Sequence, residues 1–153
     1  MKKIIRTFCV GLLCGGVFGV QAQGVAVSDA WVRSTVPGQK ATGAFMKITA
    51  PQASRLVSAS SPVAGVVEIH EMKMERDVMK MSALPQGLVL PAGQTIELKP
   101  GGYHVMLMDL KSTLSPNTQV AVKLTFQDAR GQQTTQDLSV PVMAQPAHGG
   151  HRH

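Results

Sequence analysis

Histidine and methionine residues concentrate in one stretch of the chain, between Ile69 and Asp109. Six of the nine methionines lie there, together with two of the five histidines: Met72, Met74, Met79, Met81, Met106, Met108, His70 and His104. Imidazole nitrogen and thioether sulfur, with no thiol nearby, are donors that suit Cu(I). The stretch therefore predicts a site for one soft monovalent ion.

The spacing of these residues predicts which side chains can act together. Residues i and i+2 of a strand point to the same face, about 6.5–7 Å apart. If the segments are extended, this rule pairs His104 with Met106, Met79 with Met81, and His70 with Met72. His70 and Met81 are eleven positions apart, which suits the two arms of a hairpin-like excursion.

The charge of the ligands selects the metal. Two imidazoles and two thioethers are neutral, so a bound monovalent ion leaves a single positive charge. Zinc sites usually use thiolates, carboxylates or three histidines, and Cu(II) favours tetragonal nitrogen and oxygen ligands. A blue-copper site requires a cysteine. The only cysteines, Cys9 and Cys14, lie in the segment expected to be removed on export.

The N-terminus resembles a secretory signal peptide. Lys2, Lys3 and Arg6 precede an apolar run that ends in small residues, so we expect cleavage after Ala22 and a periplasmic protein. Lipoprotein processing at Cys14 is disfavoured, because Leu13 stands where a small residue is needed. The run is shorter than the roughly 20 residues of a membrane span, so stable membrane insertion is not expected.

Loss of residues 1–22 also halves the net charge of +6 and leaves no basic cluster, which argues against a nucleic-acid partner. Residues 23–145 are long enough for one domain, and residues 146–153 form a polar, His-rich tail. Short alternating segments between Gly/Pro turns predict an all-β fold, a sandwich or small barrel. The expected strands are 25–34, 41–50, 55–60, 63–74, 77–83, 88–90, 95–99, 103–110, 120–126 and 134–142.

Several side chains have simpler structural interpretations. Trp31, Phe45 and Phe126 are expected in the core, and Met46, Met74 and Met108 as packing. Glu68, Glu71 and Asp109 flank the candidate ligands and are expected to be exposed to solvent at the rim of the site, with the alternative that one of them steers copper-loaded partners. Tyr103 either covers the site or packs.

Three motifs resemble the signature of PCu(A)C periplasmic copper chaperones: H-E-M at 70–72, M-K-M at 79–81 and K-P-G-G-Y-H-V-M-L-M at 99–108. The resemblance implies a cupredoxin-like, immunoglobulin-like β-sandwich with Greek-key connections. It also implies that His70, Met81, His104 and Met106 bind Cu(I). The chain departs from the family pattern by one extra residue between Met81 and His104, and Met79 remains an alternative to Met81.

The resemblance implies delivery of copper to copper-accepting proteins, such as cytochrome oxidase subunits or Sco-type thioredoxin-like chaperones, and we expect a monomer. We expect no enzyme, because the sequence lacks a nucleophile motif, paired carboxylates and a cofactor fingerprint. The alternative is an exported β-sandwich interaction module without a functional metal site.

A second site is predicted in the tail. Its candidate ligands for Cu(II) are Met143, His148, His151 and His153. Adventitious metal binding by a His-rich end is the alternative.

Overall fold

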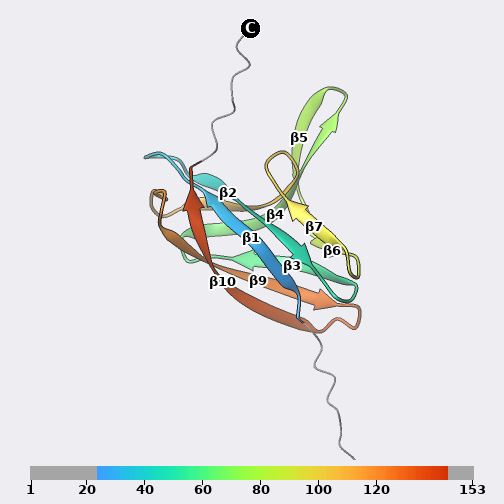
Figure 1. Cartoon of the computed structure of the whole chain (residues 1–153). Coiled ribbons are helices and arrows are strands. Elements are labelled where there is room, and N and C mark those ends of the chain that lie inside the picture. Colours follow the sequence, from blue (N-terminus) through green and yellow to red (C-terminus); the bar gives the residue numbers. More distant parts are fainter. Residues whose placement is uncertain (1–23, 145–153) are drawn as a thin grey trace, which may run out of the picture.

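The computed structural model describes residues 24–144, which contain strands and turns and no helix (Figure 1). No helix able to cross a membrane occurs in this part of the chain. All ten predicted strands are present close to their expected bounds: β1 (Ala26–Arg33), β2 (Ala41–Thr49), β3 (Ser54–Ser60), β4 (Ala64–Glu75), β5 (Val78–Ala83), β6 (Leu88–Leu90), β7 (Thr95–Leu98), β8 (Tyr103–Leu110), β9 (Gln119–Asp128) and β10 (Gln133–Met143).

The strands form two sheets. Their hydrogen bonds follow one path, β5-β4-β8-β2-β1-β10-β9-β3-β6, with β7 also paired to β2. We call the part from β5 to β1 the first sheet and the part from β10 to β6 the second. A short parallel pairing, Val32 with Val142 and Arg33 with Met143, connects β1 to β10 and so joins the two sheets. The predicted β-sandwich is confirmed, while its Greek-key connections stay a prediction.

The core lies between the sheets and follows the alternation of the sequence. In β9, Val120, Val122, Leu124 and Phe126 are buried. In β2, Ala44, Met46 and Ile48 are buried in the same apolar cluster, which confirms Met46 and Phe126 as core residues. The other face of the first sheet is left free for polar and chemically active side chains.

Strand β2 changes partner along its length. Its first half pairs with β8, from Ala41–Met108 to Ala44–Val105, and its second half pairs with β7. The chain crosses between β7 and β8 in a tight loop in which Gly102 N–H donates to Lys99 O at 3.0 Å. Gly101 has a φ of 82°, which favours glycine, so the Pro-Gly-Gly sequence explains this turn.

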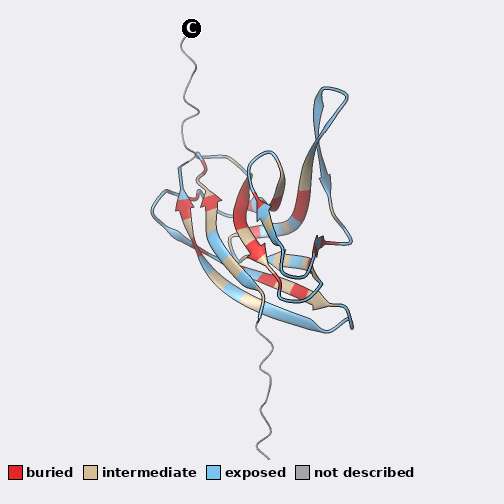
Figure 2. Cartoon of the chain, turned by 45° about the vertical axis from the view of Figure 1, so that its right-hand side comes forward, coloured by how far each residue is buried: buried red, intermediate tan, exposed pale blue. Residues whose placement is uncertain are grey.

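Strands β4 and β5 form a hairpin that extends away from the sandwich (Figure 1) and is exposed along most of its outer length (Figure 2). Its turn residues, Arg76 and Asp77, have φ values of 48° and 64°. Positive φ at both central positions is the signature of the tight type I′ hairpin turn. One packing prediction is wrong here: Met74 is 60% exposed.

Candidate metal centre

The two histidines of the central stretch face each other across β4 and β8. His70 is the direct partner of His104 in the antiparallel register. Their ring centroids are 5.7 Å apart, with an angle of 62° between the ring planes. Two imidazoles that bind one ion through nitrogens at about 2 Å have centroids about 5–6 Å apart. The backbone register therefore places both rings at a separation that fits a shared ion.

Thioethers surround this pair. A hollow of about 170 Å³ next to His104 has walls from β2, the β4–β5 hairpin and the β7–β8 loop. Its lining includes three of the four predicted ligands, Met81, His104 and Met106, and also Met72. His70 does not line the hollow and adjoins it through its contact with the His104 ring. The four predicted ligands thus belong to one region of the outer face of the first sheet.

The hairpin register separates Met81 from Met79. Met81 is the direct partner of Met72, whereas Met79 is paired with Met74, one step closer to the turn. Only the Met72–Met81 pair reaches the hollow, which favours Met81 as the ligand. Met72 is a further sulfur-bearing side chain at the edge of the hollow.

A backbone carbonyl orients the His104 ring. Nδ1 of His104 lies 3.1 Å from Gly102 O, so Nδ1–H donates to this carbonyl and Nε2 keeps its lone pair. The same oxygen accepts the N–H of Met72 at 3.0 Å. Gly102 therefore fixes both the tautomer of His104 and the base of the hairpin.

A carboxylate orients the His70 ring. Nε2 of His70 lies 2.8 Å from Glu68 Oε2, and Nδ1 is buried without a hydrogen-bond partner among the described residues. The Nε2–H donor to Glu68 leaves Nδ1 as a free acceptor, the arrangement of histidines that ligate metals. Glu68 is exposed to solvent, as expected, and its hydrogen bond to His70 adds a role that the sequence did not predict.

Aromatic residues support the rings from β1 and β2. Phe45 is 3% exposed, and its ring centroid lies 4.6 Å from that of Trp31 and 6.3 Å from that of His104. The Arg33 guanidinium carbon lies 5.3 Å from the Phe45 centroid. Phe45 is buried, as expected for a core residue, and Trp31 is half-buried. Both stack on the opposite face of the first sheet from the apolar cluster between the sheets. The β2 alternation places Phe45 there, because Ala44 and Met46 face the core.

Gly43 makes room for the Phe45 ring. A Cβ atom at Gly43 would lie 2.7 Å from Cζ of Phe45, closer than real side-chain contacts allow. Gly43 is also the β2 partner of Met106. The missing side chain thus lets the aromatic ring lie close to one of the candidate ligands.

His104 is only 4% exposed, and this burial lowers its pKa below 6.5. The hydrogen bond to Gly102 raises the pKa, whereas the nearby His70 and Arg33 lower it further. At this position the unfolded chain consequently binds more protons than the folded chain, as the pH falls from about 6.5 toward the lowered pKa. We expect the contribution of neutral His104 to the stability of the metal-free protein to be complete above this pH and to decrease as the pH falls further. This group contributes at most about 1.4 kcal/mol per pH unit.

The measurement is denaturant unfolding of the metal-free protein between pH 7.5 and 5. A His104→Gln variant, which cannot titrate here, should show a flatter profile. Identical slopes in the two proteins would contradict the lowered pKa of His104.

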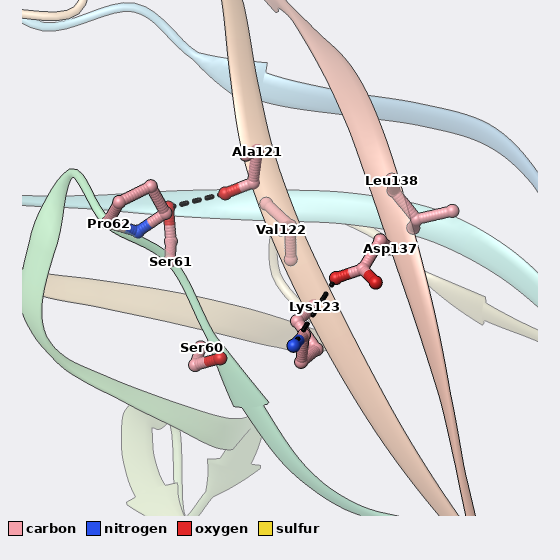
Figure 3. Close-up of a pocket in the computed structure, with 8 residues that line it drawn as sticks. All are labelled: Ser60, Ser61, Pro62, Ala121, Val122, Lys123, Asp137 and Leu138. Atoms are coloured by element: carbon pink, nitrogen blue, oxygen red, sulfur yellow. Dashed lines mark hydrogen bonds and ion pairs between the residues drawn. The ribbon is translucent and has the colours of Figure 1, made fainter.

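Other candidate places offer less chemistry. Within residues 24–144, no three His, Cys, Asp or Glu side chains are grouped to hold a metal, so a site here needs thioethers. A hollow beside β9 and β10 contains Lys123 and Asp137, 3.7 Å apart, and Ser61, whose hydroxyl donates to Ala121 O (Figure 3). Lys123 is paired with Asp137 and Ser61 with a backbone carbonyl, so these groups already have partners within the protein.

The predicted tail site stays a prediction. Met143 ends β10 and is 50% exposed. His148, His151 and His153 lie outside the described residues, as does the expected cleavage after Ala22.

Tyr103 was expected either to cover the site or to pack. It is half-buried and packs against the core.

The chain is an all-β sandwich of the PCu(A)C type, as the motifs predicted. The chain belongs to the LpqE-like family, since the model described as "Putative lipoprotein LpqE-like" matches residues 25–142. It is 36% identical over 124 residues to "Putative lipoprotein Lxx21020" of Leifsonia xyli subsp. xyli (strain CTCB07), an alignment that covers 81% of this chain and 72% of the relative.

Two solved structures show the same fold. The apo PCuAC domain from PmoF1 matches with a TM-score of 0.62 and 21% identity, over 82% of this chain and 98% of that domain. The solution structure of CuI-DR1885 from Deinococcus radiodurans matches with a TM-score of 0.59 and 31% identity, over 82% of this chain and 83% of that chain. The predicted β-sandwich is thereby confirmed.

Proposed function

We propose that the protein is a periplasmic copper chaperone that binds Cu(I) through His70, Met81, His104 and Met106. One observation carries the proposal: two buried imidazoles lie 5.7 Å apart, each with one ring nitrogen bonded to the protein and the other available. Thioethers line the hollow beside them. A purely structural pair of histidines would need partners for all of its ring nitrogens.

The surroundings favour a monovalent ion. Arg33 lies in the lining of the hollow and carries a fixed positive charge. Its repulsion of a dication is twice that of a monocation at the same distance. The Glu68 carboxylate beside His70 offsets this repulsion, so the preference for Cu(I) over Zn(II) or Cu(II) rests on the soft, neutral thioether donors.

The site is also suited to release its cargo. Met81 is 47% exposed and belongs to the projecting hairpin, so an incoming protein can reach a donor of the bound ion. The acceptors we propose are copper-requiring proteins, among them cytochrome oxidase subunits and Sco-type chaperones. DR1885 was solved as its Cu(I) form, and its 31% identity to this chain supports Cu(I) as the cargo that we propose here.

The test is anaerobic titration of Cu(I) into the mature protein with a competing chelator, followed by X-ray absorption of the loaded form. We expect one tightly bound ion with both nitrogen and sulfur scatterers. Absence of tight binding would favour the alternative, an interaction module without metal. Scattering from sulfur alone would contradict the assignment of the histidines.

A further inference from the structure

The exposed hairpin carries more thioethers than the proposed site uses. Met72 is the direct partner of Met81, and Met74 is the direct partner of Met79. Cross-strand partners share a face, and so do residues i and i+2. The four sulfur-bearing side chains thus form two consecutive pairs on one face, leading from the hollow toward the turn.

The outer pair is not there for packing. Met74 is 60% exposed and Met79 is 43% exposed, whereas the core methionine Met46 is 1% exposed. Apolar side chains stabilise a fold by being removed from water, and these two are left in it. The charged residues of the hairpin alternate with them, and Lys80 forms an ion pair of 2.7 Å with Glu75.

The geometry of the pair suits a soft cation. Directly opposed residues have Cβ atoms about 4.5–5.5 Å apart, and methionine has three rotatable bonds with which to adjust its sulfur. Two opposed thioethers can therefore both bind one metal ion that takes sulfur donors at about 2.3 Å. Met72, two residues from Met74 on the same face, is positioned to supply a third sulfur.

We propose that Met74 and Met79, with Met72, form a second and weaker site for Cu(I), and that this site loads the main one. Its donors are neutral and exposed, so the ion exchanges easily. Met72 and Met81 are partners at the edge of the hollow, so the ion can pass from Met74 and Met79 to Met81 by replacing one sulfur ligand at a time. This inference rests on the proposed function, because it requires a Cu(I) site at the hollow.

The test follows the methyl groups of ¹³C-methionine-labelled mature protein by NMR during anaerobic addition of Cu(I). The first equivalent should shift the signals of Met81 and Met106. The second should shift those of Met74 and Met79. A double variant, Met74→Leu with Met79→Leu, should bind the first equivalent with unchanged affinity but load more slowly, and its Met72 signal should no longer respond to the second.

Met108→Leu is the matched control, because Met108 lies outside the hairpin and the lining of the hollow; it should behave as the wild type. Unmoved Met74 and Met79 signals, with tight binding of the first equivalent intact, would overturn the second site alone. No tight first equivalent would instead overturn the proposed function. If the double variant loads at the normal rate but transfers Cu(I) to an acceptor protein more slowly, the loading site is overturned. The outer methionines would then form a docking surface for the acceptor.

Discussion

Replacement of His104 by alanine should lower the affinity for Cu(I) by more than about 100-fold. Loss of an outer partner of a metal ligand commonly costs about 10–100-fold in affinity, and loss of the ligand itself costs more. His104 is the only proposed ligand that both lines the hollow and contacts the second histidine. The measurement is a competition titration with a Cu(I) chelator of known affinity.

The thioethers of β8 provide the matched control. Met106 and Met108 are two residues apart on one face of β8, but only Met106 lines the hollow. Leucine conserves the volume of methionine and removes the sulfur donor. Met106→Leu should weaken Cu(I) binding, and Met108→Leu should leave it unchanged. Equal losses in the two variants, or unchanged affinity in His104→Ala, would refute the ligand assignment.

Local sequence patterns predicted the strands and part of the site. The shared face of His104 and Met106 follows from their spacing alone. The meeting of His70 with His104 does not, because it depends on the register between β4 and β8 and on their being neighbours in the sheet. Strand pairing between distant segments is a property of the whole fold, and no local period encodes it.

The choice between Met79 and Met81 depended on the turn of the hairpin. Arg76-Asp77 is not the Asn-Gly or Asp-Gly sequence that signals a two-residue turn, so the register could not be predicted from the sequence. The roles of Glu68 and Gly102 were also missed, since the hydrogen bonds of a ring nitrogen depend on side-chain orientation. Phe45 could have been placed correctly, because the alternation of β2 puts it opposite the core-facing Ala44 and Met46.

Replacement of Phe45 should have the second large effect, on both the stability of the protein and its affinity for Cu(I). Phe45→Ala should destabilise the protein by about 3–5 kcal/mol, the usual cost of removing a buried phenylalanine ring. It should also weaken Cu(I) binding, because the Phe45 ring is close to both Trp31 and His104, and its loss frees the imidazole to move. The free energy of unfolding is measured with denaturant, and the affinity is measured where the variant remains folded.

Phe126→Ala separates the two consequences. Phe126 is also almost fully buried, at 2% exposed, but it belongs to the core between the sheets and not to the outer face that carries the site. We expect a similar loss of stability with an unchanged Cu(I) affinity of the folded protein. If both variants lost affinity equally, general loosening of the sandwich would explain the effect. If neither did, the aromatic layer would stabilise the sheet without positioning His104.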